Sequence, residues 1–376
     1  MRRILTLAAV STLFVSAFAQ NGKPEGFVFT TVDSIPVTSV KDQAQSGTCW
    51  SFSSLSFFES ELIRKGKGEL DLAEMFVVHK TMEDRAQAAV RLHGDIEFAQ
   101  GGSFYDVVYC WKNYGIVPQE IMPGMLYKSE RINHTELTAV ATAYVDALAK
   151  SSLKKLSNVW QKGFSGIYDA YIGECPEKFT YNGKEYTPKS YAESLGLNMD
   201  DYISLTSYTH HPFYEQFILE IQDNWRWGLS YNLPLYEFME VMHNAIKNGY
   251  TFAWGADVSE TGFRRDTTGV CVIPQDDKLA AAKIEPSTPE KEITQEMRQE
   301  AYDNWETTDD HGMHIFGIAK DQNGKEYFMV KNSWNTTNGR KGIWFASDAY
   351  VAYKTMNILV HKDAIPKDIK KKLGIK

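Results

Sequence analysis

The hydrophobic pattern of the chain predicts a helix that begins near Cys49 and ends before Gly66. Its apolar positions recur at helical spacing and are Trp50, Leu55, Phe58 and Leu62. The residues before it, Ser46 to Thr48, supply a tight turn and hydroxyl groups that can cap a helix. A cysteine in the first turn lies at the positive end of the helix dipole, which favours the thiolate form.

The last third of the chain alternates between strand and helix patterns. Residues 236–249 have the apolar spacing of a helix, and the β-branched and aromatic run 250–258 follows as a strand. The polar stretch 275–308 predicts a loop and then a helix that starts at Ser287 or Thr288. Further strands are expected at 315–320, 326–334, 342–347 and 353–365. Residues 125–231 contain helix-like runs such as 137–156, separated by polar loops.

The amino terminus has the pattern of an export signal. Arg2 and Arg3 precede an apolar run from Ile4 to Phe18, and Ala17 and Ala19 are small residues at the positions that a signal peptidase reads. The run is shorter than the roughly 20 residues that a membrane-spanning helix needs. We therefore predict cleavage after Ala19, no membrane span, and a periplasmic or secreted location.

Charge and cysteine content narrow the class of protein further. The formal net charge is -8, and removal of residues 1–19 would make it more negative by two. An acidic chain whose only basic cluster is the tail at 367–372 is a poor candidate for binding nucleic acid. Four cysteines are too few for a disulfide framework. If Cys49 stays free, at most one disulfide can form, and the apolar surroundings of Cys110 favour a buried thiol.

Candidate catalytic residues lie at both ends of the chain. Cys49 is the candidate nucleophile, with Gln43 six residues before it, and His311 and Asn332 follow far downstream. An imidazole that takes the thiol proton, an amide that orients the imidazole and a donor for the oxyanion form a complete set for thiol catalysis. Taken singly, each of these residues would more often be structural.

The segment around His311 allows two alternative hypotheses, a different catalytic base and a metal site. His314 competes with His311 as the base, but residues three apart on a strand face opposite sides, so only one can enter a cleft. Asp309, Asp310 and the two histidines could also bind zinc or iron. No HExxH helix or cysteine pair with zinc-ligand spacing accompanies them, and a metal would occupy the histidine that Cys49 needs. We therefore predict no metal and no cofactor.

Three ordered segments carry a family resemblance. DQAQSGTCWSF (42–52) resembles the nucleophile segment of papain-like cysteine peptidases, 101–118 resembles their Gly-Gly substrate strand and following helix, and 311–347 resembles their His and Asn strands. The resemblance implies that Cys49, His311, Asn332 and Gln43 are catalytic, and it favours His311 over His314. It also implies that the substrate side of the cleft includes Gly101, Gly102, Asp310, Trp334 and Ala256, with Trp334 shielding the His311–Asn332 bond from water.

The chain is most similar to the bleomycin hydrolase and aminopeptidase C branch of that family. Ser46 stands where secreted papains have a disulfide cysteine, and His311 follows Cys49 by far more than the roughly 130 to 150 residues of papain. The resemblance implies an α+β, papain-like two-domain fold with a helical half, an antiparallel β-barrel-like half and a helical insertion. The expected parts are a signal peptide (1–19), an extended arm (20–38), the helical half (39–124), a mainly helical insertion (125–235) and the β-rich half (236–376).

One departure from the branch leaves the specificity open. In bleomycin hydrolase-like enzymes the carboxyl terminus extends into the cleft and captures the amino group of the substrate, but this chain stops soon after the strand 353–365. We expect peptide or protein substrates and an aminopeptidase C-like action. A broader endopeptidase and a non-catalytic peptide-binding relative remain alternatives, and the hexamer of the branch is in doubt although an oligomer stays open.

Overall fold

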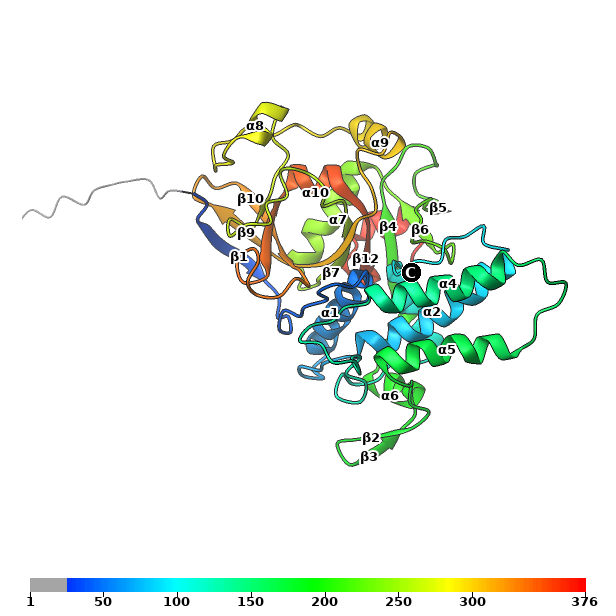
Figure 1. Ribbon diagram of the computed structural model, residues 1–376. Helices are drawn as coiled ribbons and strands as arrows, with labels where there is room; N and C mark the ends of the chain where they lie inside the picture. The colour runs from blue at the N-terminus through cyan, green and yellow to red at the C-terminus, as the bar shows by residue number, and fades with distance from the viewer. Residues whose placement is uncertain (1–25) are drawn as a thin grey trace, which may run out of the picture.

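The computed structural model describes residues 26–376, and a helical part packs against a sheet part (Figure 1). The predicted signal peptide lies outside the described residues. The helices are α1 (Cys49–Arg64), α2 (Glu74–Arg91), α3 (Phe104–Asn113), α4 (Thr135–Ala149), α5 (Val159–Ile172), α6 (Pro188–Leu195), α7 (Leu235–Lys247), α8 (Asp277–Ala281), α9 (Gln295–Asp303), α10 (Asp348–Lys354) and α11 (Lys367–Lys372), with short 3-10 helices η1 (Met199–Asp201) and η2 (Lys362–Ala364).

The strands form one large sheet and one hairpin. They are β1 (Phe29–Ser34), β2 (Phe179–Tyr181), β3 (Lys184–Tyr186), β4 (Tyr202–Thr206), β5 (Gln216–Ile218), β6 (Leu229–Asn232), β7 (Phe252–Ala256), β8 (Val270–Cys271), β9 (His311–Asp321), β10 (Glu326–Lys331), β11 (Ile343–Ser347) and β12 (Thr355–His361). The large sheet runs in the order β5-β6-β4-β12-β7-β9-β10-β11-β8, and β1 pairs with β9. Most pairs are antiparallel, while β4 with β6 and β8 with β11 are parallel.

Strand β9 organises the sheet around the candidate base. It begins at His311, and Ala256 of β7 stands opposite that residue. β10 pairs with β9 on the other side, and β1 pairs with its second half, from Gly317 to Asp321. The mixed α+β architecture predicted from the sequence is confirmed, and His311 is fixed at the end of a strand with partners on both edges.

Helix α1 lies between the two parts and is almost entirely buried. Its serines can be buried because their hydroxyls bond within the helix: Ser53 Oγ donates to the Cys49 carbonyl at 2.8 Å, and Ser54 Oγ to the Trp50 carbonyl at 2.7 Å. On one side α1 packs in the core of the helical part, and on the other it packs against β9 and β7. The helix predicted from Cys49 to Gly66 is thus confirmed as the element that joins the two parts.

Three sequence-based expectations differ in part from the observed elements. Residues 125–235 are mainly helical only through α4, α5 and α6, because the end of this range supplies strands β4, β5 and β6 to the large sheet. The helix expected to start at Ser287 or Thr288 is α9, which starts at Gln295 because Thr294 caps it by accepting from the Met297 N–H. Part of the predicted arm 20–38 is also strand β1 rather than free chain.

Two further expectations concern cysteines and membranes. All four cysteines are free, so the one disulfide that the sequence allowed is not formed, and Cys110 is a buried thiol as predicted. Among residues 26–376, none of the helices has the length and apolarity required to cross a membrane.

A buried ionic cluster lies beneath the junction of the two parts. Lys41 Nζ is 3.2 Å from a Glu59 carboxylate oxygen, 2.5 Å from one of Glu74 and 2.6 Å from one of Asp71. The side chains of Glu59 and Glu74 are 0% and 3% exposed, so their charges depend on Lys41. The cluster ties the segment that leads to Gln43 to α1 and α2.

Candidate active site

Cys49 is the first residue of α1 and lines a small cleft between the helical part and the sheet. Thr48 occupies the N-cap position, but it makes no capping hydrogen bond, contrary to the sequence-based expectation. Its hydroxyl instead contacts Ser46 Oγ at 2.6 Å, and Ser46 Oγ donates to the Gln43 carbonyl at 2.8 Å. The hydroxyls therefore fix the turn before the helix and leave its first N–H groups facing the cleft.

His311 and Asn332 are held together at the other side of this cleft. His311 Nε2 lies 2.7 Å from Asn332 Oδ1, which also accepts from the Ser333 N–H at 2.7 Å. Because Oδ1 is an acceptor, Nε2 carries the proton and Nδ1 keeps its lone pair. Trp334 stacks on the imidazole with ring centroids 4.5 Å apart. The ring is therefore fixed in orientation and covered on one face.

His311 and Cys49 line the same cleft, whose volume is about 30 Å³. Gly312 explains how strand β9 can come so close to α1. A Cβ at Gly312 would lie 2.7 Å from Ser53 Oγ and 3.4 Å from the Cys49 carbonyl oxygen, so a side chain would push the strand away. Within residues 26–376 no hydrogen bond joins Cys49 Sγ to His311. The small cleft that both of them line shows that the two residues are close.

Burial disfavours the charged form of the Cys49 thiol and the charged form of the His311 imidazole. Desolvation raises the pKa of Cys49 to about 12, with further increases from Asp223 and Asp309, while the Gly312 and Trp50 N–H groups lower it. Desolvation lowers the pKa of His311 to about 4 despite its bond to Asn332. A lone thiolate or a lone imidazolium is therefore unfavourable in this cleft, and only a proton transfer that creates both charges together can offset this cost.

Gln43 links the nucleophile segment to the Asn332 segment. Its Nε2 donates to the Ser46 carbonyl at 2.8 Å, and its Oε1 accepts from Ser333 Oγ at 2.6 Å. The Gln43 N–H also donates to the Ser333 carbonyl at 2.8 Å. The side chain is buried and its amide orientation is fixed from both ends, which is what a preorganised donor requires.

The predicted substrate residues divide into those that line the cleft and those that do not. Gly102 and Asp310 line it. Gly101 does not line the cleft. Its carbonyl accepts from Arg85 at 2.5 Å, and the Asp223 carboxylate packs against its Cα. Trp334 contacts the imidazole but does not line the cleft.

The prediction for Ala256 is wrong. This residue is fully buried in the core of the sheet part, and Gly255 lines the cleft in its place. The reason is the alternation of side chains along a strand, which sends neighbouring positions of β7 to opposite faces. The other cleft residues that the sequence analysis did not single out are Trp50, Ser103, Phe104, Ile221, Asp223 and Asn357.

His314 lies on the opposite face of β9 from His311. It is fully buried and its Nδ1 is 2.9 Å from Ser56 Oγ of α1, so it does not enter the cleft. Desolvation lowers its pKa well below the ordinary value. Asp309, Asp310, His311 and His314 therefore do not converge, which removes the geometric basis of the metal alternative at this segment.

Three carboxylates gather at one end of the cleft: Asp223, Asp309 and Asp310. Desolvation and the charges of Asp223 and Asp310 raise the pKa of Asp309 to about 8. Arg85 partly compensates Asp223 at 3.6 Å, but among the described residues Asp309 has no ion-pair partner. Ionisation of all three carboxyl groups together is therefore unfavourable at this end of the cleft, close to the thiol.

Comparison with known proteins assigns the chain to a class. Residues 70–375 match the model of the Peptidase C1-like family, and the chain belongs to this family. This confirms the papain-like cysteine peptidase relationship, in the bleomycin hydrolase and aminopeptidase C branch, that the motifs predict. Cys49 and Gln43 lie before the matched range, so their assignment depends on the motif and the geometry above.

Individual relatives are distant but cover most of the chain. It is 24% identical to aminopeptidase G of Lactobacillus delbrueckii subsp. lactis, over 91% of this chain and 84% of that protein. It is 25% identical to aminopeptidase C of Streptococcus thermophilus, over 86% of this chain and 80% of that protein. The crystal structure of PepW from Lactobacillus rhamnosis has the same fold, with a TM-score of 0.70 at 20% identity, covering 92% of this chain and 84% of that one.

Proposed function

We propose that this protein is a cysteine aminopeptidase, in which Cys49 attacks the first peptide bond of a peptide substrate and His311 moves the protons. The observation that carries the proposal is the His311 Nε2 to Asn332 Oδ1 hydrogen bond of 2.7 Å beside a cysteine in the same cleft. It leaves His311 Nδ1 as a base, and Cys49 is the thiol available to it in that cleft.

The chemistry would proceed through an acyl-enzyme. Transfer of the proton from Sγ to Nδ1 creates a thiolate and an imidazolium together, and opposite charges about 4 Å apart attract by about 4 kcal/mol at an effective dielectric constant of 20. The thiolate adds to the carbonyl carbon, and the imidazolium gives its proton to the leaving amine as the C–N bond breaks. Water, deprotonated by His311, then cleaves the thioester and regenerates the thiol.

Gln43 is the side chain that we assign to the oxyanion. A primary amide has two N–H bonds, and Gln43 uses one on the Ser46 carbonyl, which leaves the other for a substrate oxygen. The N–H of Cys49 at the start of α1 is the second donor. Each such donor is typically worth about 3 kcal/mol of transition-state stabilisation.

The carboxylates of the cleft support removal of N-terminal residues. Asp223 and Asp309 lie close enough to Cys49 to raise its pKa. A substrate with one residue before the scissile bond would place its ammonium nitrogen two bonds, about 2.5 Å, from the reacting carbonyl carbon. An ammonium ion there would oppose the desolvation and the mutual repulsion that raise the pKa of Asp309. Carboxylates of the cleft would then recognise the free amine.

We expect Asp309→Asn to lower kcat/KM for peptides with a free amino terminus by about 10- to 100-fold, because a charge-assisted hydrogen bond contributes roughly 1.5–3 kcal/mol. Hydrolysis of N-acetylated versions should be slow in the wild type and unchanged by the substitution. Asp200→Asn is the matched control, since Asp200 is exposed and, among residues 26–376, pairs only with Lys112. Rapid release of internal fragments from acetylated peptides would refute the aminopeptidase assignment and favour an endopeptidase.

The peptidase assignment has a separate test in covalent labelling. An epoxide inhibitor of the E-64 type should modify one cysteine per chain, and peptide mapping should locate the adduct at Cys49. Cys49→Ser should take up no label. A protein that binds peptides without turnover would remain unlabelled in its native form.

We also propose that the chain is exported, on the basis of its first nineteen residues. Expression in a bacterial host with a secretion pathway should yield a mature protein whose sequence begins at Gln20. Edman sequencing of protein from the periplasm or medium measures this. Recovery of the chain in the cytosol with Met1 still present would contradict the prediction.

A further inference from the structure

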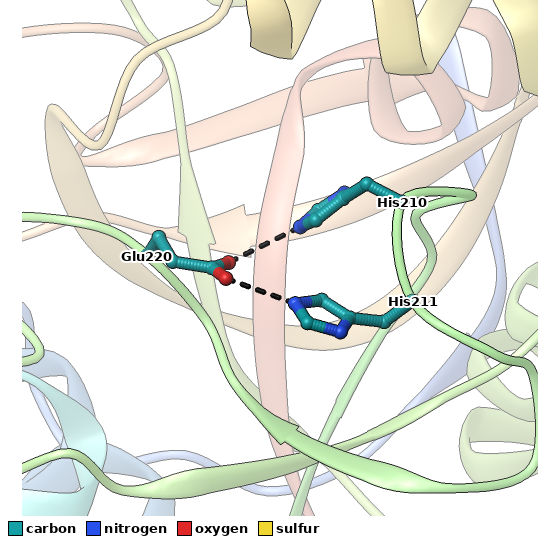
Figure 2. Close-up of side chains that lie close together, drawn as sticks. All are labelled: His210, His211 and Glu220. Atoms are coloured by element: carbon teal, nitrogen blue, oxygen red, sulfur yellow. Dashed lines mark hydrogen bonds and ion pairs between the residues drawn. The ribbon is translucent and has the colours of Figure 1, made fainter.

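A second cluster of chemically active side chains lies apart from Cys49 and His311. His210 and His211 are in the loop between β4 and β5, and Glu220 follows β5. Figure 2 shows both imidazole rings directed at the carboxylate of Glu220. His210 Nε2 is 3.1 Å from one carboxylate oxygen and His211 Nε2 is 2.9 Å from the other.

The spacing of these atoms fits a tetrahedral ion. The three groups offer ligand atoms that all lie within 4.8 Å of one another. Around zinc, with bonds of about 2.0–2.2 Å to nitrogen and oxygen, neighbouring ligand atoms are roughly 3.3 Å apart. The side chains are 27%, 35% and 55% exposed, so a fourth position toward solvent is open to water. Two imidazoles and a carboxylate are a typical ligand set for zinc-class metals.

Outer contacts hold the imidazoles in place. His210 Nδ1 lies 3.1 Å from Gln299 Nε2 and 3.3 Å from Gln299 Oε1, so the Gln299 amide holds the outer edge of the ring whichever ring nitrogen carries the proton. The ring of His210 also stacks on Tyr302, and that of His211 stacks on Phe217 at 4.3 Å between centroids. Exposed ion pairs contribute little stability by themselves, and they do not require imidazole rings that are held by several further contacts.

The backbone of the cluster is fixed as well. The buried Asn232 side chain donates to the carbonyls of Tyr208 and His211 at 2.7 and 2.9 Å, and it accepts from the Tyr208 N–H. On the other side, Tyr302 Oη donates to the Glu220 carbonyl at 2.8 Å. The loop that carries the two histidines and the residue that carries the carboxylate are thus each anchored independently of their mutual contact.

We propose that His210, His211 and Glu220 bind one divalent metal ion of the zinc class, with water as the fourth ligand. The imidazoles bind through Nε2 in their neutral forms, so any proton held on Nε2 moves to Nδ1 or to solvent as the ion enters. The site is separate from the peptidase chemistry, because none of its ligands lines the Cys49 cleft.

The site borders the cleft through a neighbouring cavity. Glu220 and Tyr302 line a cavity of about 390 Å³, and Ile221 and Asp309 line both this cavity and the Cys49 cleft. Glu220 is also three residues before Asp223. An ion bound to Glu220 would therefore fix the start of the segment that carries two of the cleft residues.

Zinc binding is best measured in the Cys49→Ser chain, because a thiol and an imidazole at the catalytic cleft could bind zinc themselves. Calorimetric titration with zinc chloride, with metal analysis after dialysis, should give one ion per chain. Adding His210→Ala or Glu220→Gln should weaken binding by roughly 100-fold or more, since loss of an outer-shell partner alone typically costs 10- to 100-fold.

The control is His243→Ala in the same background, since within the described part of the chain His243 pairs with a single carboxylate, that of Asp348 at 3.1 Å. It should bind zinc as the parent does. Glu220→Gln alters an exposed side chain, and its melting temperature without zinc verifies that it is folded. The proposal is overturned if the Cys49→Ser chain retains no zinc, or if the folded His210→Ala and Glu220→Gln chains retain it with the parent's affinity.

Discussion

Cys49→Ser should lower kcat/KM for peptide hydrolysis by roughly 10⁴-fold or more, with little change in the melting temperature. The hydroxyl of serine is a far weaker acid than a thiol, and a neutral imidazole in this cleft, with its pKa lowered to about 4, does not deprotonate it readily. Steady-state kinetics with a fluorogenic peptide that has a free amino terminus measures the loss.

Two further variants separate a catalytic role from a structural one. His311→Ala should cause a loss similar to that of Cys49→Ser, and the double variant should be no worse than either, because residues that act as a unit are not additive. Cys175→Ser is the control, since Cys175 is a free thiol that does not line the cleft. Retention of more than a few per cent of activity in a purified Cys49→Ser chain would exclude Cys49 as the nucleophile.

Lys41→Met should lower the free energy of unfolding by about 3–5 kcal/mol, the usual cost of removing one partner from a buried ion pair. Lys41 pairs directly with Glu59 and Glu74, whose side chains are almost fully buried, and methionine removes this contact and leaves them the more distant charge of Lys331. Urea unfolding followed by circular dichroism measures the change. Lys150→Met, which breaks an exposed helical pair with Asp146, should cost no more than about 0.5 kcal/mol.

The deficit of Lys41→Met should depend on pH in a defined direction. Desolvation raises the pKa of Glu74 to about 7 in the folded protein, with Lys41 opposing this increase. A carboxyl whose folded pKa lies above its unfolded value favours the folded state at low pH, and this contribution is lost as pH rises through the folded pKa. Without Lys41 the effect is larger, so the difference from wild type should shrink between pH 8 and pH 5. A constant difference would mean that the lost packing, rather than charge, dominates.

The elements that carry the candidate catalytic residues could be predicted from the sequence because their signals are local. The apolar spacing after Cys49 and the stop at Gly66 define α1, and the motif around His311 and Asn332 falls on β9 and on the residues just after β10. Each of these patterns lies within about twenty residues, where helix and strand periodicity is reliable. The same holds for the confirmed burial of the Cys110 thiol.

The substrate side of the cleft could not be predicted in the same way. Strand β7 is buried on both faces, so its run of apolar residues does not indicate whether Gly255 or Ala256 faces the cleft. Asp223 lies in a loop of the large insertion and reaches the cleft only through tertiary packing against Gly101. His210 and His211 gave no signal either, since their shared carboxylate, Glu220, belongs to another turn of the chain.

The pairing of β1 with β9 limits how far the protein can be shortened from its amino terminus. Phe29 stacks on Phe345 with ring centroids 3.8 Å apart, and residues 29–34 occupy an edge of the strand that begins with His311. Proteolysis that stops before residue 27 would leave this edge covered. Trimming past Phe29 would expose the backbone of β9 from Gly317 to Asp321, so proteolysis beyond that point should destabilise this edge of the sheet.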